Sequence, residues 1–481
     1  NGLPSKNSFF GTIDNFCLTQ IVMCFAHYVF GKPNKELEVV DFSDLDEHEQ
    51  KNYKWITEVY PDYNEIDDTQ INNLQMLFLK GYVLVNSLEL LALHILKKSS
   101  ACQRYIQARF KYVFIDEYQD ADTYTNELFM YLIKLGITGV AVGDENQSIF
   151  GFVKKSSVYL KALKDRNDFT AFKLSDNFRC SIPIINYSNR LLDSESPVYK
   201  TEHDGVFLVR VNGSEKDISN FIDNKIEDIK NKLSVDNNSE IAILVRNERT
   251  QRIIDESLST PHRLVCTTKL DSDLNPRSRL YTLLLHFYFD ERFPFLSILD
   301  GYVDYDMLST FNKQRLHEES EIIKSIPIKE IDELVDHFRS IADIILPKIQ
   351  EGSSILRLRE VLSNSKELES YKPMLSDKIQ LMTLHKSKGL EFDIVFHLNM
   401  CEWELPFRII KDNDFNNPLY PNWEQDLNLH YVGVTRARKA CFLVRGTQRT
   451  NNRDILKMAK DSEFLSLNGI EVLRKDYWYG L

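Results

Sequence analysis

Two apolar runs that end in polar side chains stand close together in the first third of this chain. Tyr112–Ile115 ends in the adjacent carboxylates Asp116 and Glu117, and the run 140–142 is followed shortly by Gln147. The segment between the runs has helical periodicity, so the pattern predicts two parallel strands joined by a helix. Because ligands collect at the carboxyl ends of parallel strands, these polar side chains are expected to share one site.

Apolar strand patterns and amphipathic helix patterns alternate along much of the remaining chain. Helical periodicity predominates in residues 18–109, including a predicted helix at 82–96, and again in residues 271–377. A short strand is expected at residues 172–174. Further strands are predicted at residues 206–211, 241–245, 379–383, 394–397 and 440–444.

This order predicts an α/β protein with two parallel-sheet cores, each interrupted by a helical insertion. The expected first core covers residues 1–175, and its insertion lies at about 20–105. The expected second core covers residues 176–270 and 377–481, with a helical insertion at 271–376 between its two parts.

Composition is typical of a globular protein with two to four domains, because the 481 residues include 43% hydrophobic and 27% charged side chains. No apolar run reaches the ~18 residues expected of a membrane span. No signal peptide opens the chain. The seven cysteines are scattered without a CxxC pair, which favours reduced thiols and a cytoplasmic location over a zinc site or a disulfide framework.

The net charge of −12 argues against a protein that coats nucleic acid through bulk electrostatics, although it leaves room for a local basic groove. Much of the acidity lies in residues 36–49 and 62–68. We interpret these two segments as solvated surface, and docking to a basic partner protein is the alternative.

Six sequence blocks occur in one order along the chain. They are GTIDNF at 11–16, DEYQD at 116–120, GDENQSI at 143–149, LSDNFRCSIPII at 174–185, IQLMTLHKSKGLEFDIVF at 379–396 and LHYVGVTRARKACFLV at 429–444. Together the blocks resemble superfamily-one helicases of the UvrD/Rep type. The resemblance implies two RecA-like cores, ATP and Mg²⁺ as cofactors, and ATP-dependent helicase or translocase activity on single-stranded DNA.

The resemblance also implies roles for five residues in ATP hydrolysis. Asp116 would be the Mg²⁺ ligand and Glu117 the general base. Gln147 would sense the γ-phosphate and couple it to DNA. Arg179 and Arg436 would reach the γ-phosphate from the second core, Arg436 as the arginine finger, because a planar guanidinium suits bidentate phosphate recognition.

Further residues are implied at the nucleotide and at DNA. The nucleotide set contains Lys388 and Gly389, on a turn near the nucleotide, and Glu391, which would hydrogen-bond the ribose. The DNA set contains Thr12, Phe150, Phe152, Thr383 and His385. The two phenylalanines either stack on bases, which is worth ~1–3 kcal/mol per base, or serve as core aromatics.

No phosphate-loop pattern GxxxxGK[ST] occurs in the chain, although the family has this loop upstream of the GTIDNF element. Either the chain shown lacks the opening segment of the family, or it is a degenerate member that binds ATP poorly. The start at Asn1, which is not a methionine, and the presence of both acids and both arginines favour the first interpretation.

The chain is similar in size and texture to the helicase-like subunits of Gabija anti-phage systems. This similarity rests on DEYQD, the following LFMYL, the GTxD pattern near the start, the NFRC block and the insertion at 271–376, which is smaller than in full-size UvrD-like helicases. This similarity implies an OLD-type nuclease subunit (GajA-like) as partner and unwound or single-stranded DNA as ligand. Three hypotheses follow: a helicase subunit of a defence complex, a helicase-shaped DNA sensor with little ATP turnover, or a solitary DNA-repair helicase.

Overall fold

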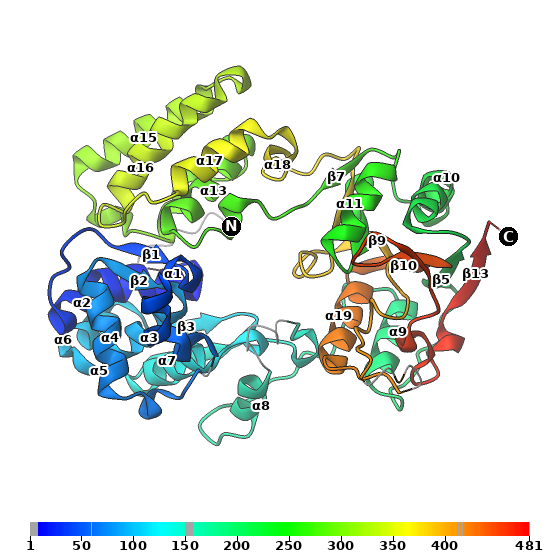
Figure 1. Ribbon diagram of the computed structural model, residues 1–481, viewed down its shortest axis with the longest axis horizontal. Helices are drawn as coiled ribbons and strands as arrows, with labels where there is room; N and C mark the ends of the chain where they lie inside the picture. The colour runs from blue at the N-terminus through cyan, green and yellow to red at the C-terminus, as the bar shows by residue number, and fades with distance from the viewer. Residues whose placement is uncertain (1–7, 59, 150–156, 412–413, 415–416, 481) are drawn as a thin grey trace. The chain divides into compact units, whose positions relative to one another are not determined.

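The structure is a computed structural model that describes residues 8–58, 60–149, 157–411, 414 and 417–480. Contacts within the chain divide it into two compact units, which we describe separately (Figure 1). Unit 1 contains residues 1–142 and 267–373, and unit 2 contains residues 143–266 and 374–481. The units thus change after residues 142, 266 and 373, whereas the predicted core boundaries follow residues 175, 270 and 376. The assignment of those core boundaries stays a prediction.

Unit 1 is mainly helical and contains two small parallel sheets. Its first helices are α1 (Ile13–Phe16), α2 (Met23–Phe30), α3 (Glu47–Glu58), α4 (Asp68–Leu79), α5 (Leu88–Lys98), α6 (Ser100–Arg109) and α7 (Thr123–Lys134). Strand β1 (Glu38–Val40) pairs with β2 (Tyr82–Leu84), and β3 (Tyr112–Ile115) pairs with β4 (Thr138–Ala141). The strand–helix–strand prediction around Asp116 is therefore confirmed.

The predicted helix at residues 82–96 is wrong over its first part. Gly81 has a φ of +89°, a conformation that favours glycine and reverses the chain after α4. Tyr82–Leu84 then pairs with β1, and α5 begins only at Leu88. The apolar residues of β2 form a hydrogen-bonded ladder with β1, and the periodicity of the segment alone cannot reveal this partner strand.

The expectation that no apolar stretch is long enough to span a membrane is also wrong. The helical stretch Ile13–Phe30 passes that test by length and composition. In the structure every residue of its central π-helical turn, Cys17–Val22, is buried. This turn packs in one hydrophobic core with α5, as expected for a core helix.

The second part of unit 1 is a helical insertion that shares this hydrophobic core. Its helices are α12 (Lys269–Ser272), α13 (Pro276–Phe289), α14 (Phe295–Asp300), α15 (Thr310–Ser325), α16 (Leu334–Ile345), α17 (Ser354–Ser363) and α18 (Ser365–Glu369). Figure 1 shows α15 and α16 side by side, in agreement with their packing. The insertion predicted between residues 271 and 376 is thus helical.

Acidic residues in the two segments interpreted as solvated surface cap the starts of helices. Asp41 forms a capping box with Asp44, and Asp67 accepts a hydrogen bond of 2.8 Å from the backbone N–H of Gln70 at the start of α4. Ser, Thr, Asp and Asn are the preferred residues at such positions. Local capping therefore accounts for part of this acidity.

Unit 2 is built on a seven-stranded parallel sheet. The strand order is β13-β5-β10-β9-β6-β8-β7. The strands are β5 (Val206–Val211), β6 (Ile241–Val245), β7 (His262–Leu264), β8 (Ile379–Thr383), β9 (Phe392–His397), β10 (Ala437–Gly446) and β13 (Lys475–Tyr479). A separate antiparallel hairpin joins β11 (Gln448–Thr450) to β12 (Leu456–Met458). Helix α8 (Val158–Lys164) precedes the first strand.

Helices cover both faces of this sheet, as buried parallel strands require. Side chains of α10 (Glu215–Leu233) and α11 (Glu248–Ser257) pack with Ile241, Ile243 and Val245 of β6. Side chains of α9 (Ile182–Leu192) and α19 (Trp423–Thr435) pack with Ala242 and Leu244 on the other face. Alternate residues of β6 therefore face opposite helical layers, and the predicted α/β class is confirmed.

The strand expected at residues 172–174 is absent from the described part of the chain. Phe172 and Leu174 are 88% and 95% exposed and lie in a segment without regular structure. An apolar run forms a strand only where a neighbouring strand satisfies its backbone, and no described strand pairs with this one.

Candidate functional site

The two predicted catalytic acids follow β3 in unit 1. Both Asp116 and Glu117 are exposed, and Asp116 Oδ1 accepts a hydrogen bond of 2.9 Å from the backbone N–H of Glu117. Glu117 has a φ of 54°, in the left-handed region that non-glycine residues rarely adopt. Its Oε2 accepts a hydrogen bond from Nε2 of the buried Gln119. The turn after β3 therefore fixes Glu117 in an unusual conformation, as occurs at functional sites.

Gln147 lies in unit 2, where α19 holds the segment that carries it. The carbonyl of Gln147 accepts a hydrogen bond of 3.1 Å from Lys388 Nζ. Asn428 Nδ2 donates to the carbonyl of Ser148 over 3.0 Å, and Gln425 Nε2 donates to the carbonyl of Ile149 over 2.8 Å. Side chains from residues 388–428 thus fix the backbone of the GDENQSI block.

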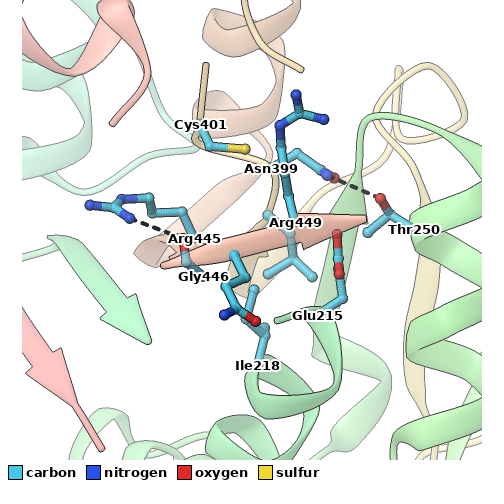
Figure 2. Close-up of a pocket in the computed structure, with 10 residues that line it drawn as sticks. Glu215, Ile218, Thr250, Asn399, Cys401, Arg445, Gly446 and Arg449 are labelled. Carbon is cyan, nitrogen blue, oxygen red and sulfur yellow. Dashed lines mark hydrogen bonds between the residues drawn. The ribbon is translucent and has the colours of Figure 1, made fainter. Parts of the chain in front are cut away.

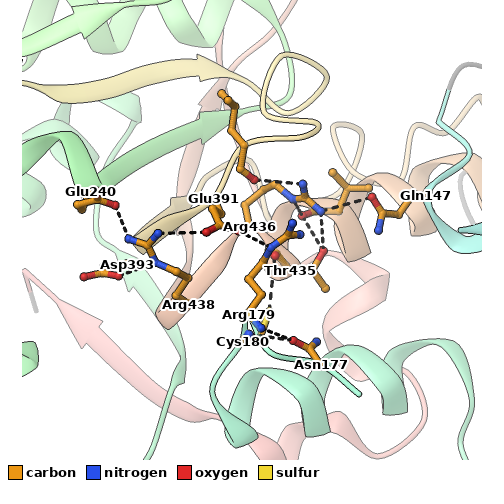
Figure 3. A network of polar contacts seen from close by, with 12 residues as sticks. Gln147, Asn177, Arg179, Cys180, Glu240, Glu391, Asp393, Thr435, Arg436 and Arg438 are labelled. Atoms are coloured by element: carbon orange, nitrogen blue, oxygen red, sulfur yellow. Dashed lines mark hydrogen bonds and ion pairs between the residues drawn. The ribbon is translucent and has the colours of Figure 1, made fainter. Parts of the chain in front are cut away.

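Arg436, the predicted arginine finger, is 1% exposed at the C-terminal end of α19. Its Nε donates to the carbonyl of Val432 over 3.2 Å, and its Nη1 donates to the carbonyl of Leu390 over 3.1 Å. Its Nη2 lies 3.4 Å from Gln147 Oε1 and from Thr435 Oγ1 (Figure 3). The structure therefore brings Arg436 and Gln147 together, and the buried guanidinium of Arg436 is hydrogen-bonded to backbone carbonyls.

Arg179 and Glu391 form an ion pair in the same unit. Arg179 Nε donates to Glu391 Oε2 over 2.7 Å, and both side chains are partly exposed. Asn177 Oδ1 accepts the backbone N–H groups of Arg179 and Cys180 at 3.0 and 2.9 Å, which shapes the loop before α9. The hydrogen bond from Arg179 keeps the pKa of Glu391 below its usual range, so this carboxylate is ionised at neutral pH.

Arg438 is a member of this group that the sequence reasoning missed. Its Nη1 lies 3.3 Å from Glu391 Oε1, its Nε donates to Asp393 Oδ1 over 2.7 Å, and its Nη2 donates to Glu240. Figure 3 shows Arg438 between these carboxylates, with Glu391 between it and Arg179. No local signal identifies Arg438, because Glu240 is far away in the sequence.

The predicted nucleotide turn follows β8. Leu390 N–H donates to the carbonyl of Ser387 over 3.0 Å, which closes the turn that carries Lys388 and Gly389. Gly389 has a φ of +81° and open space at the position of a Cβ. A glycine is needed for this backbone conformation and leaves room for a close ligand.

The predicted DNA-contacting residues lie in different parts of the structure. Thr12 belongs to unit 1 and caps α1 by accepting the N–H of Asn15 over 3.2 Å. Thr383 and His385 belong to unit 2, and burial lowers the pKa of His385 to about 4, so that its ring is neutral at pH 7. Phe150 and Phe152 lie outside the described residues.

A small pocket elsewhere in unit 2 is lined by polar and apolar side chains (Figure 2). Asn399 Nδ2 donates to Thr250 Oγ1 over 3.0 Å beside it, and Glu215 accepts both the N–H and the hydroxyl of Thr450 at 2.8 Å. Its described lining residues include none of the predicted site residues. The pocket is therefore separate from the Arg179–Arg436 group.

Comparison with known families matches most of the chain to one kind of protein. Residues 14–169 match the UvrD/REP helicase N-terminal domain, and residues 302–447 match the UvrD-like helicase C-terminal domain. The two matches together cover more than half of the 481 residues and occur in the order of the family.

Curated relatives agree with these matches. Gabija protein GajB of Bacillus cereus (strain VD045) is 25% identical over 468 residues, which cover 93% of this chain and 83% of that protein. ATP-dependent DNA helicase Rep of Buchnera aphidicola subsp. Acyrthosiphon pisum is 24% identical, over 76% of this chain and 67% of Rep. ATP-dependent DNA helicase PcrA of Staphylococcus aureus is 24% identical, and the match spans 56% of PcrA. The predicted resemblance is confirmed, and the chain belongs to the UvrD-like helicase family.

Proposed function

We propose that this protein is an ATP-dependent DNA helicase or translocase that acts on single-stranded DNA in the bacterial cytoplasm. The observation that carries the proposal is the convergence in unit 2 of Gln147, Arg179, Lys388, Glu391 and Arg436, which come from four separate sequence blocks. Two arginines, a lysine, an amide and a carboxylate near one another suit recognition of a nucleoside triphosphate.

The acids after β3 suit the ion that accompanies such a nucleotide. The exposed Asp116 offers the carboxylate oxygens that Mg²⁺ prefers, and Glu117 beside it suits a base that orients water. Bound Mg²⁺ would neutralise charge that develops on the transferred phosphate. Among the described residues, no group of three His, Cys, Asp or Glu could hold a metal alone, so nucleotide phosphates would complete its coordination.

We further propose that the protein is the helicase subunit of an anti-phage complex with an OLD-type nuclease partner (GajA-like). The support is the similarity to Gabija protein GajB over 93% of this chain and 83% of that relative. The Rep and PcrA matches cover a smaller share of those longer proteins, which favours the defence role over that of a solitary repair helicase.

A helicase-shaped DNA sensor with little ATP turnover is the second candidate. The observation in its favour is the buried guanidinium of Arg436, which is bonded to backbone carbonyls of Val432 and Leu390. In this case the UvrD-like fold would recognise DNA and hold its nuclease partner without hydrolysis.

ATP hydrolysis by the full-length protein, with and without single-stranded DNA, separates the two candidates. We expect DNA-stimulated hydrolysis that Glu117→Gln abolishes, because a neutral amide cannot accept the proton of water. Glu58→Gln, which alters an exposed carboxylate paired with Lys54 at 3.1 Å in the same unit, serves as the control and should retain activity. Absence of hydrolysis, both alone and with the nuclease, would reject the motor.

Phage protection tests the defence role. If the protein is an ATP-driven motor, cells that carry Glu117→Gln together with the native nuclease should lose protection in a plaque assay. If the protein is instead a DNA sensor with little ATP turnover, the same strain should keep full protection. Glu117 is a better choice than Arg436 for this test, because its side chain is exposed and its replacement leaves the core intact.

A further inference from the structure

The guanidinium of Arg179 is hydrogen-bonded at Nε, and its two terminal nitrogens face no hydrogen-bond acceptor among the described residues. Its Nε donates to Glu391 Oε2 over 2.7 Å. Within the described residues its two terminal amino groups have no partner, and the side chain is 36% exposed. A guanidinium anchored through Nε presents its remaining donors as a fork, which is the arrangement that binds phosphate oxygens.

Glu391 is itself held from its other side. Arg438 Nη1 lies 3.3 Å from Glu391 Oε1, so each oxygen of this carboxylate faces a different arginine. The other nitrogens of Arg438 engage Asp393 and Glu240, which fixes the Arg438 side chain (Figure 3). The resulting chain of contacts runs from two carboxylates through Arg438 and Glu391 to Arg179.

Backbone hydrogen bonds also connect the loop that carries Arg179 with the strand that carries Arg438. The N–H of Ser181 donates to the carbonyl of Arg438 over 2.7 Å, and the Ser181 hydroxyl donates to the carbonyl of Lys439 over 3.2 Å. Asn177 fixes the N–H of Arg179 in the same loop. The loop of Arg179 is therefore hydrogen-bonded to the start of β10.

We propose that Glu391 and Arg438 are positioning residues, which orient the guanidinium fork of Arg179 toward the phosphates of a nucleoside triphosphate. This inference rests on the proposed ATP-dependent function. It gives Glu391 a role different from the ribose contact that the family resemblance implied. The triphosphate would meet an arginine that is already oriented, so less side-chain entropy is lost on binding.

The test measures binding of a non-hydrolysable ATP analogue by calorimetry, and the kcat and KM of DNA-stimulated hydrolysis, for the full-length protein. Glu391→Gln and Arg438→Gln should each weaken analogue binding about tenfold, since misorientation of a binding group has effects of this size or larger. Arg438→Lys should not rescue binding, because one ammonium cannot hold three carboxylates in a planar arrangement.

The decisive comparison places Glu391→Gln in an Arg179→Ala background. If Glu391 acts through Arg179, the second substitution causes no further loss. An undiminished further loss would overturn the inference. So would a loss seen with ATP but not with 2′,3′-dideoxy-ATP, because that result assigns Glu391 to the ribose.

Controls separate folding from positioning. Arg252→Ala removes an exposed arginine that lies 3.7 Å from Asp454 in the same unit and should bind the analogue like the native protein. Glu391 is partly exposed, so its variant keeps the test valid even if Arg438→Gln lowers the melting temperature. A native protein that binds no analogue overturns the proposed function and this inference together, whereas binding with additive losses overturns only the inference.

Discussion

Replacement of Arg436 by alanine should destabilise unit 2, whatever role this arginine has in hydrolysis. The side chain is among the largest fully buried ones in the described structure. Its guanidinium bonds the carbonyls of Val432 and Leu390, and its own carbonyl accepts the N–H of Phe392 over 2.8 Å. Arg436 thus links the end of α19 to the segment before β9.

The magnitude follows from the carbonyl of Leu390, which loses its donor, because the carbonyl of Val432 still accepts the backbone N–H of residue 436 over 3.1 Å. A buried acceptor left without a hydrogen bond costs ~1–3 kcal/mol, and the lost packing of the side chain adds to this cost. Relief from burying a cation offsets part of the loss. We therefore expect a decrease of about 2–4 kcal/mol in the free energy of unfolding of unit 2.

Urea and thermal unfolding followed by tryptophan fluorescence measure this decrease. Three of the four tryptophans, Trp403, Trp423 and Trp478, belong to unit 2, so the signal reports mainly on this unit. For a unit of this size each kcal/mol corresponds to about 2–4 °C in Tm, so Arg436→Ala should lower Tm by about 4–16 °C.

Arg179→Ala is the matched comparison, because Arg179 is partly exposed and the family resemblance gives it the same role. Its unfolding free energy should change by less than ~0.5 kcal/mol. An Arg436→Ala variant with native stability would refute the reasoning. Loss of hydrolysis in such a variant would instead identify Arg436 as a side chain that works only on the nucleotide.

Three further predictions concern buried groups. Burial lowers the pKa of His397 to about 4 from 6.5, and its neighbour His430, 3.1 Å away, is shifted in the same direction. The unfolded chain binds more protons between these values, so stability is lost as the pH falls, by about 2 kcal/mol from His397 alone between pH 7 and 5 in urea titrations. Gly433→Ala should cost ~1–3 kcal/mol by the same assay, because a Cβ there would lie 2.8 Å from His397 Cδ2. Burial and the nearby carboxylate of Asp14 raise the pKa of Glu89, so Glu89 destabilises the native protein increasingly as the pH rises above 4.5. Glu89→Gln should remove this slope, and an unchanged pH profile of Tm would contradict the assignment.

Part of the local structure around the candidate site could be predicted from the sequence, because it is encoded in short segments. Asp116 and Glu117 follow an apolar run, and this run forms the strand β3, which delivers both carboxylates to the sheet edge although Tyr112 and Phe114 in it are exposed. The positive φ of Gly389 likewise matches the turn predicted around it. Local periodicity was sufficient for the strand, whereas the turn was implied by the resemblance of its sequence block to helicases of the UvrD/Rep type.

The environment of these side chains could not be predicted, because burial and pairing depend on residues far apart in the chain. The sequence does not distinguish the environments of Arg179 and Arg436. In the structure Arg179 is partly exposed, whereas Arg436 is enclosed by α19 and the segment before β9. The neutral state of His385 depends on burial, which lowers its pKa.

The sequence by itself determined the α/β class, the helical insertions and the family, because periodicity and motif order are properties of contiguous residues. The tertiary structure alone decided that Arg438 joins Glu240, Asp393 and Glu391, since these residues meet only when β9, β10 and the turn before β6 pack together. It also decided that the apolar stretch Ile13–Phe30 contributes to a hydrophobic core. The free energies of burial and of ion pairing depend on which residues are neighbours in space, and these residues become neighbours only when the chain folds.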